Sequence, residues 1–338
     1  MSQDYALRVA GLKTSFTTHA GIVRAVDGVS LCVAPGETIA IVGESGSGKS
    51  VTALSIMGLI RRPQGTVEGQ IVLNGTNLVS LSERQMRTVR GKAISMVFQE
   101  PMTSLNPVLS VGAQISEAIL AHEAVGRKAA WYRAIDLLDL VRIPEPQRTV
   151  REFPHRLSGG MRQRVMIAMA IACKPVILIA DEPTTALDVT IQAQILDLLD
   201  GLRRDLGMGL LLITHDLGVV SQMANRVIVM YAGRKVEEAA TEEFFLRPRH
   251  PYSRGLVSAS PRIDTVGNYQ RGPLYEIPGM VPSLLDLPPG CPFADRCTYV
   301  MDVCRQRMPA PTPTNSNGEV SCFAVQGTGH SATEPVAR

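Results

Sequence analysis

The chain has 338 residues, of which 45% are hydrophobic and 19% charged, and its formal net charge is +3. This composition excludes a disordered chain, and the length allows a core that needs no disulfide bonds. Aromatic residues amount to only 4% and basic residues stand beside acidic ones, so we expect no nucleic-acid partner. The longest strongly apolar run, residues 165–173, is about half as long as a bilayer crossing requires, and we see no basic and apolar leader. We therefore expect a cytoplasmic protein without a membrane span.

The first part of the chain predicts β structure of two kinds. Residues 5–37 have the pattern of strands joined by turns, and residues 38–42 form a short apolar run typical of a buried strand. Asn74-Gly75 lies between two short segments of strand character and predicts a hairpin, which requires antiparallel strands. An antiparallel β unit is therefore expected beside a parallel core.

Helical periodicity begins at Val111 and extends to about Val141, which we interpret as a helical insertion. After Leu157 the pattern alternates between helix and strand. The expected elements are a helix over 161–173, a strand over 176–180, a helix that ends near Gly207, and strands over 210–214 and 227–231. Parallel neighbouring strands need helical crossovers of this kind, so the core is predicted to be a parallel α/β sheet.

Proline and glycine dominate from Pro261 onward, and the periodicity disappears. We place a domain boundary near residue 260. The expected organisation is a nucleotide-binding domain over 1–260 with a helical subdomain over about 101–157, a C-terminal extension over 261–326, and a loose tail over 327–338.

The segment from Gly43 to Ser50 matches G-x-x-x-x-G-K-[ST], a phosphate-binding loop between a strand and a helix. Backbone N–H groups and the helix N-terminus surround phosphate oxygens in such a loop. Lys49 is predicted to reach the β- and γ-phosphates, and Ser50 to supply a hydroxyl to Mg²⁺. The predicted nucleotide-binding residues of this loop are Gly43, Glu44, Ser45, Gly46, Ser47, Gly48, Lys49, Ser50 and Val51. A plain glycine-rich turn is the alternative.

Two carboxylates, Asp181 and Glu182, follow the apolar run that begins at Val176. A carboxylate at the end of a buried strand is costly without a partner, so Asp181 is expected to face the Mg²⁺ held by Ser50. Glu182 is the candidate base that orients and deprotonates the attacking water. The alternative is that Asp181 and Glu182 mark only the place where the strand ends and meets solvent.

The stretch Leu157-Ser158-Gly159-Gly160-Met161 resembles the signature of ATP-binding cassette (ABC) ATPases, and its position before Asp181 is similar too. Ser158, Gly159 and Gly160 open a helix and therefore predict a second anion site. The resemblance implies an ABC-type P-loop fold: a mixed α/β core, an antiparallel β subdomain and a helical insertion. It also implies that this second site docks on ATP held by a partner cassette. Met161 stands where many cassettes have Gln.

Further residues match the family one by one. The resemblance gives Gln99 a role in sensing Mg²⁺ or water, His215 a contact with the γ-phosphate, and Asp188 a contact with the opposite subunit. Phe16 is the candidate for stacking on adenine. A core histidine and a core phenylalanine are the alternatives for His215 and Phe16.

The C-terminal part is similar to the extension of oligopeptide and dipeptide importer ATPases, on residues 249–256, 277–279 and 291–297. This resemblance implies an ATPase that powers peptide import from the cytoplasmic face of the plasma (inner) membrane. The implied partners are a second, non-identical cassette, two permease subunits and an extracytoplasmic solute-binding protein. An importer of nickel or glutathione, a soluble ABC clamp in repair or translation, and a cassette that binds ATP without turnover are the alternatives.

Four cysteines cluster in this extension: Cys291, Cys297, Cys304 and Cys322. In a cytosolic, proline-rich segment they predict a metal site rather than disulfides, although close C-x₂-C pairs are lacking. Some members of the resembled subfamily hold a [4Fe–4S] cluster through such a tetrad, which we take as the leading hypothesis. Zinc and unliganded or oxidised thiols are the alternatives. Cys32 and Cys173 are expected to be buried structural thiols.

Overall fold

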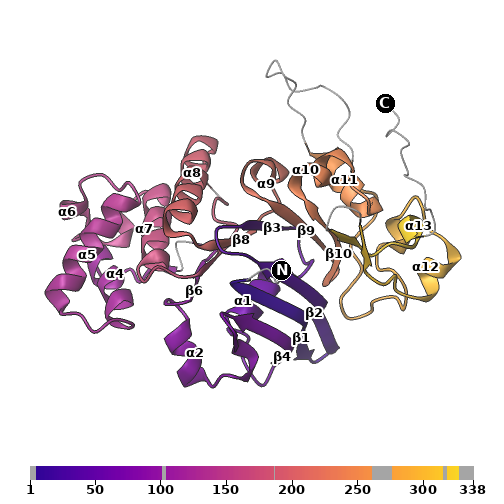
Figure 1. Ribbon diagram of the computed structural model, residues 1–338, viewed down its shortest axis with the longest axis horizontal. Coiled ribbons are helices and arrows are strands. Elements are labelled where there is room, and N and C mark those ends of the chain that lie inside the picture. Colours follow the sequence, from indigo (N-terminus) through magenta and orange to yellow (C-terminus); the bar gives the residue numbers. More distant parts are fainter. Residues whose placement is uncertain (1–4, 101–103, 186, 261–275, 315–317, 327–338) are drawn as a thin grey trace, which may run out of the picture.

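The computed structural model describes residues 5–100, 104–185, 187–260, 276–314 and 318–326. Two β-sheets stand near the middle of the molecule, with helices packed on and beside them (Figure 1). The predicted α/β fold class is confirmed. The start of the predicted helical subdomain, the boundary after residue 260 and the predicted tail lie outside the described residues, as does Ala186.

The smaller sheet is antiparallel, with strand order β2-β1-β4-β5. Residues of β1 alternate between buried and exposed along most of the strand, which is the pattern of a sheet with one face on the core. Asn74 and Gly75 form the predicted turn, and Leu73 pairs with Thr76 across it. The strands are β1 (Leu7–Thr18), β2 (Gly21–Val33), β4 (Gly65–Leu73) and β5 (Thr76–Asn77).

The larger sheet has the order β11-β12-β10-β9-β3-β8-β7-β6, and its five strands from β9 to β6 are parallel. Every residue of β3, β7 and β8 is buried, which explains why these segments read as continuous apolar runs. The strands are β3 (Thr38–Val42), β6 (Ile94–Val97), β7 (Ile177–Asp181), β8 (Gly209–Ile213), β9 (Arg226–Tyr231), β10 (Arg234–Ala240), β11 (Thr312–Pro313) and β12 (Glu319–Val320).

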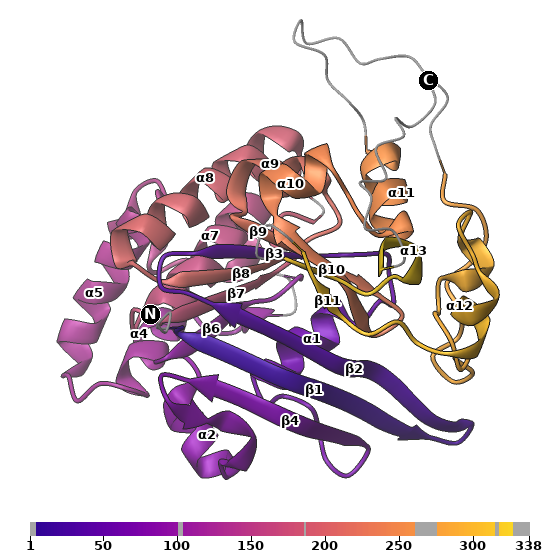
Figure 2. The same ribbon diagram turned by 45° about the vertical axis from the view of Figure 1, so that its right-hand side comes forward.

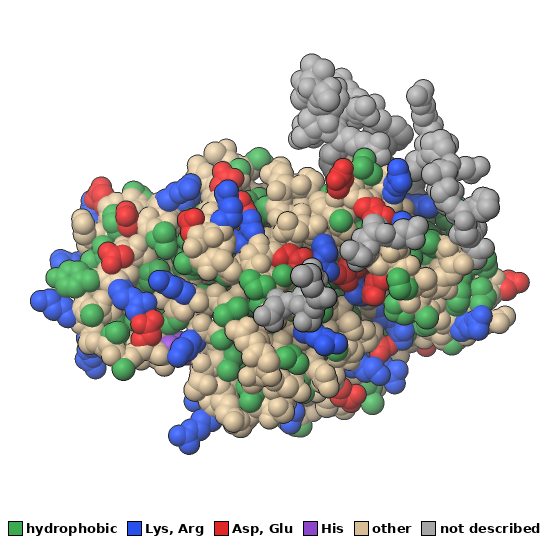
Figure 3. Space-filling model, in the orientation of Figure 1, with side chains coloured by type: hydrophobic (Ala, Val, Ile, Leu, Met, Phe, Trp, Pro, Cys, Tyr) green, Lys and Arg blue, Asp and Glu red, His purple; other side chains and the backbone are tan. Residues whose placement is uncertain are grey.

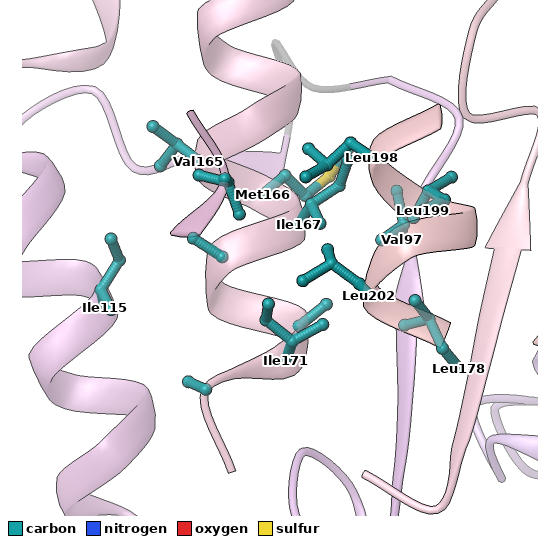
Figure 4. Close-up of a cluster of buried hydrophobic side chains, with 14 of the residues drawn as sticks. Val97, Ile115, Val165, Met166, Ile167, Ile171, Leu178, Leu198, Leu199 and Leu202 are labelled. Carbon is teal, nitrogen blue, oxygen red and sulfur yellow. The ribbon is translucent and has the colours of Figure 1, made fainter. Parts of the chain in front are cut away.

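Alternate residues of β7 pack on two different cores. Ile177 and Ile179 join the cluster of buried residues between the two sheets, together with Ala53 and Ile56 of α1 (Lys49–Ile56). Leu178 and Ala180 instead join the cluster around α7 (Gly159–Ile171) and α8 (Val189–Leu206), part of which Figure 4 shows. Helix α1 therefore starts at the edge where the parallel strands end, sandwiched between the sheets.

The predicted helical insertion is present as separate helices rather than one. They are α4 (Val111–Leu120), α5 (Arg127–Leu140) and α6 (Pro146–Thr149). Ser110 caps α4 by accepting a hydrogen bond from the backbone N–H of Ala113 at 3.3 Å. Together with α7 these helices form one end of the molecule, away from β1 and β2 (Figure 1).

The remaining helices lie on the sheets or beside them (Figure 1). They are α2 (Glu83–Val89), α9 (Leu217–Met223), α10 (Thr241–Leu246), α11 (Pro251–Ala259), α12 (Asp302–Gln306) and α13 (Phe323–Gln326), with short 3₁₀ turns at Leu78–Ser80, Pro154–Arg156 and Ala294–Arg296. None of the helices in the described part of the chain combines the length and apolar character that a bilayer crossing demands. On the face shown in Figure 3, basic and acidic side chains are interspersed.

The C-terminal extension is less irregular than its sequence predicts. Its strand β12 pairs antiparallel with β10, through Glu237 with Val320 and Glu238 with Glu319, and so adds to the large sheet. Lys235 pairs with both Glu238 and Glu319, at 2.5 and 2.7 Å. Phe293 of the extension belongs to the same buried cluster as Tyr231 and Tyr252. The extension and the preceding domain therefore share a sheet and a core (Figure 2).

Candidate functional site

The loop from Gly43 to Ser50 connects β3 to α1, as predicted, and close contacts require two of its glycines. Gly43 has φ of 152° and Gly48 has φ of 97°. A Cβ on Gly43 would lie 2.2 Å from the carbonyl oxygen of Met230, and one on Gly48 would lie 2.4 Å from that of Ala25. The loop is thus pressed against neighbouring strands in a conformation that favours glycine.

Lys49 lies inside this loop. Its Nζ donates to the carbonyl oxygens of Gly43 at 2.7 Å and Glu44 at 3.0 Å, and it lies 3.5 Å from Oγ of Ser47. The side chain is buried, and this burial lowers the pKa of Lys49, although nearby Glu182, Asp181 and Glu44 oppose the effect. A buried ammonium whose bonds go to neutral oxygens is suited to an anionic ligand.

Ser50 and Asp181 meet across the end of the parallel sheet. Oγ of Ser50 donates to Oδ1 of Asp181 at 3.1 Å. Asp181 is only 5% exposed, and burial raises its pKa, against the effect of the hydrogen bond from Ser50. Mg²⁺ in nucleotide sites is held by one or two protein oxygens together with phosphate oxygens, and this hydroxyl and carboxylate fit that donor set. The structure thus brings the two residues together as the sequence predicts.

Glu182 is the centre of a hydrogen-bonded cluster. Nε2 of Gln99 donates to its Oε2 at 2.9 Å, and Nδ1 of His215 lies 3.2 Å from its Oε1. All three candidate catalytic residues are therefore in contact, although they lie on three different segments of the chain. Glu182 has a left-handed backbone, with φ of 46°, which is uncommon outside glycine and occurs at functional sites.

Thr185 is also a member of this cluster, through a contact with Glu182 that the sequence did not predict. Its hydroxyl donates to Oε2 of Glu182 at 2.9 Å. The signal was present, because Thr185 lies three residues after Glu182 in a tight turn: its backbone N–H donates to the carbonyl of Glu182 at 3.2 Å. In such a turn, a short polar side chain three residues after the glutamate can donate a hydrogen bond to its carboxylate.

The signature residues lie at the helical end of the molecule. Ser158 caps α7, and its Oγ accepts from the N–H of Met161 at 3.3 Å, while Gly159 and Gly160 form the first turn. A Cβ on Gly160 would lie 2.7 Å from Ile191 of α8. Asp188 caps α8 in the same manner, accepting from the N–H of Ile191 at 3.0 Å. The structure thus shows both side chains as helix caps, while their contacts with a partner stay predictions.

Phe16 lies in β1, half-buried, and pairs with Val23 of β2 and Gly65 of β4. On the same strand, Thr14 forms a buried hydrogen bond of 2.7 Å with Ser55 of α1. Adenine stacking by Phe16 stays a prediction. In the phosphate loop, the N–H of Gly233 donates to the carbonyl of Ser47 at 3.0 Å, and the N–H of Ser47 donates to the carbonyl of Glu44 at 3.2 Å.

Comparisons with known proteins agree with this geometry. A family model described as ABC transporter matches residues 26–185, which include the phosphate loop, the signature and both carboxylates. The dipeptide transport ATP-binding protein DppD of Bacillus subtilis is 50% identical over 321 residues, which cover 95% of each chain. The chain belongs to the ABC transporter family. A second model, the C-terminal region of oligopeptide/dipeptide transporters, matches residues 236–304 of this ABC ATPase.

Other relatives lead to the same family. The oligopeptide transport ATP-binding protein AppD of Bacillus subtilis is 50% identical to this ABC ATPase, over 96% of this chain and 98% of its own. Among solved structures, the bacterial ABC transporter cassette MJ0796, described as dimeric, has a TM-score of 0.62 and 29% identity, and covers 70% of this chain. The same cassette in a post-hydrolysis state with ADP and phosphate has a TM-score of 0.63.

The four C-terminal cysteines are brought to one place. Cys291, Cys297, Cys304 and Cys322 line a single small pocket together with His250 and Phe293, and none of them is in a disulfide. Burial raises the pKa of Cys291 to about 11 and also raises those of Cys297 and Cys322. Without a metal ion, burial therefore favours the neutral thiol at these three positions.

The predicted iron–sulfur centre is not supported by this arrangement. Within the described ranges, which include all four thiols, no group of three or more His, Cys, Asp or Glu side chains is placed to hold a metal ion. The four cysteines thus line one pocket, but among the described residues their side chains are not arranged to hold a metal ion. Cys32 and Cys173 are half-buried rather than fully buried, and burial raises the pKa of both thiols.

Proposed function

We propose that this chain is the ATP-hydrolysing subunit of an importer for peptides. The observation that carries the hydrolysis is the position of Glu182, which is bonded to Gln99 and adjacent to the Ser50–Asp181 pair at the end of β7. The match of residues 236–304 to the oligopeptide/dipeptide transporter region, and the names of the full-length relatives, support a peptide as the transported solute.

The roles of the residues follow from their chemistry. Lys49 and backbone N–H groups of the phosphate loop bind and orient the phosphates of ATP. Ser50 and Asp181, with Gln99 nearby, would hold Mg²⁺, which when bound neutralises charge that develops on the transferred phosphoryl group. Glu182 accepts a proton from the attacking water at a carboxylate oxygen, and Gln99 and Thr185 fix the direction of that carboxylate. His215, beside Oε1 of Glu182, is placed to hold the γ-phosphate.

A second cassette completes the site in this proposal. Ser158, Gly159, Gly160 and Asp188 would face ATP bound to the partner, and the MJ0796 cassette, which is 29% identical, is described as dimeric. We propose that the partner is a non-identical cassette. Size and composition of the purified importer test this: a single type of cassette in stoichiometric amount would contradict it.

The remaining partners are proposed from the same relatives. They are two permease subunits and an extracytoplasmic solute-binding protein, with this chain bound at the cytoplasmic face of the inner membrane. Gln99, together with the helices α4 to α6, would relay the nucleotide state to the permeases. A nickel or glutathione importer has the same machinery and differs only in the solute that stimulates it.

Reconstitution of the complete importer tests this function. The chain would be co-expressed with the proposed permease subunits, and the purified complex would be placed in liposomes with the proposed solute-binding protein. We expect ATP-dependent uptake of labelled di- or oligopeptides. ATPase activity that nickel or glutathione stimulates, and peptides do not, would show that the transported solute is not a peptide. Stable association with ribosomes or DNA, without membrane partners, would contradict the transport function and favour a soluble ABC clamp.

Iron–sulfur ligation is a separate hypothesis for the four cysteines. The pocket that they share favours it, and the absence of ligand geometry among the described residues counts against it. Iron and acid-labile sulfide should be measured in protein purified without oxygen. About four irons per chain would support a [4Fe–4S] cluster, and iron-free protein with four reactive thiols would remove it.

A further inference from the structure

Glu44, the second residue of the phosphate loop, has all of its polar groups occupied. Its N–H donates to Oη of Tyr252 at 2.8 Å, and its carbonyl accepts from Nζ of Lys49 at 3.0 Å. Its carboxylate accepts from Nη1 of Arg296 at 3.0 Å. Two of these three partners, Tyr252 and Arg296, come from the C-terminal segment that follows β10. The loop is therefore held from outside the nucleotide-binding motifs.

Arg296 is itself rigidly placed. Its side chain is only 6% exposed, and its Nε and Nη2 donate to the carbonyls of Pro278 at 2.8 Å and Ile277 at 3.1 Å. Nη1 also lies 3.3 Å from Oη of Tyr231. Beneath it the rings of Tyr231, Tyr252 and Phe293 pack on one another, with centroids 4.7 to 5.4 Å apart. A guanidinium anchored by several acceptors has little freedom to follow a displaced carboxylate.

The ion pair with Arg296 matters for ATP binding because Glu44 is negatively charged. Glu44 lies close enough to Lys49 to interact with its ammonium group. An unneutralised carboxylate there would compete with phosphate for Lys49 and would repel the triphosphate, and the partly buried surroundings screen that repulsion poorly. Paired with Arg296, Glu44 contributes almost no net charge beside the phosphates.

We propose that Arg296 is a positioning residue for ATP binding, through which the C-terminal extension neutralises Glu44 and holds the entrance of the phosphate loop. The extension therefore sets the nucleotide affinity of this cassette. This inference rests on the proposed role of the Lys49 loop as the phosphate site. Arg296 touches neither the reacting phosphate nor the water in this scheme, so it acts on binding and not on the chemical step.

The test measures binding of Mg²⁺ and the non-hydrolysable analogue AMP-PNP to the full-length chain by equilibrium dialysis. The variants are Arg296→Gln, Glu44→Gln and the double variant, with Arg305→Gln as a matched control. Arg305 lies in the same extension and pairs with Asp295, but both side chains are exposed, at 57% and 79%. We expect Arg296→Gln to weaken AMP-PNP binding about tenfold, since it leaves a charge unpaired. The control should stay within about twofold of the natural chain, as exposed pairs contribute little.

The double variant distinguishes a charge effect from a general loss of structure. Removing Glu44's charge as well should restore AMP-PNP binding to within about threefold of the natural chain, even though the bonds to Ile277 and Pro278 stay broken. In the assembled importer, Arg296→Gln should raise KM for ATP with kcat nearly unchanged. Arg296→Lys, which keeps the charge, should retain most of the affinity and serves if Arg296→Gln does not fold.

Three results would overturn the proposal: unchanged binding by Arg296→Gln, an equal loss in the double variant, or a fall in kcat without a change in KM. Failure of the proposed ATPase function would look different. In that case the natural chain and Arg305→Gln would also fail to bind AMP-PNP.

Discussion

At the scale of single residues, the site depends on how carboxylates are paired. Asp181 and Glu182 are neighbours in sequence, but Asp181 faces Ser50 and Glu182 faces Gln99 and His215. Asp181 is the last residue of β7, and Glu182 follows it with a left-handed backbone, φ of 46°. The two adjacent acids thus have different partners, which suits Asp181 for binding a metal ion and Glu182 for accepting a proton.

Glu182→Gln tests the assignment of the base. The amide keeps the size of the side chain and one acceptor oxygen but cannot accept a proton from water, so we expect ATP binding to persist while turnover falls about 10² to 10⁴-fold. Single-turnover hydrolysis and AMP-PNP binding, measured on the same preparation, separate the two. Glu145→Gln, an exposed change in the helical end, is the control. Turnover near that of the natural chain would remove Glu182 from the mechanism.

Asp181→Asn should stabilise the chain in the absence of nucleotide. Burial raises the pKa of Asp181, so the stability that it contributes is present at low pH and is lost as pH rises from its ordinary value through the raised one. Near neutral pH the ionised form is therefore a cost, which the neutral amide avoids. We expect Tm to rise by about 2 °C without Mg²⁺ and nucleotide, and the stabilisation by Mg²⁺ and AMP-PNP to disappear. A lower Tm in the apo protein would contradict this.

At the scale of elements, the regular segments of the core follow from their sequence. The buried strand at 38–42 has the predicted bounds, and α8 ends where Gly207 adopts φ of 64°. Short amphipathic elements such as α2, α9 and α10 were not predicted, because each has only six or seven residues and shows too little periodicity. For α2 a signal existed: Ser82 and Gln85 form a capping box.

Helix α11 is attached to β10 through buried polar groups. Both oxygens of Glu237 accept backbone N–H groups, from Arg249 at 2.9 Å and His250 at 2.8 Å. Nδ1 of His250 then caps the helix by accepting from the N–H of Tyr252 at 3.1 Å. The imidazole must be neutral at this nitrogen, and burial lowers the pKa of His250 to about 3.

This cap predicts an acid-sensitive helix. A lowered pKa means that the unfolded chain binds a proton that the folded chain does not, so stability is lost as pH falls from about 6.5 towards 3. We expect this proton to contribute a slope of about 1.4 kcal/mol per pH unit to the free energy of unfolding. His250→Asn, which can still cap, should remove that contribution, whereas the exposed His155→Asn should not. The free energy of unfolding would be measured by urea titration at several pH values. The same dependence on pH in both variants would contradict the assignment.

At the scale of the whole molecule, the extension is continuous with the cassette. Strand β12 lengthens the large sheet, Phe293 packs on Tyr231 and Tyr252, and Arg296 reaches the phosphate loop. Gly318 is needed for this docking, because a Cβ there would lie 2.2 Å from the carbonyl oxygen of Glu238. A shared sheet and core make separate unfolding of the two parts costly.

We therefore expect one cooperative unfolding transition for residues of both parts. Calorimetry should show a single peak that shifts as a whole to higher temperature with Mg²⁺ and AMP-PNP, by mass action on the folded state. Gly318→Val should lower the temperature of that same peak. A separate, earlier transition that does not respond to nucleotide would show that the extension unfolds on its own.

The sequence by itself determined the nucleotide loop, the signature helix and the longer strands and helices of the core, because each depends on local periodicity, caps or glycine spacing. Only the tertiary structure decided which distant residues meet. Gln99, Glu182 and His215 come together because three segments end at one edge, and Thr185 joins them through a turn. No sequence motif predicts the pairing of Arg296 with Glu44. The four thiols share a pocket, but within the described residues they are not placed to hold a metal ion. Contacts between segments so far apart depend on packing, which local pattern does not encode.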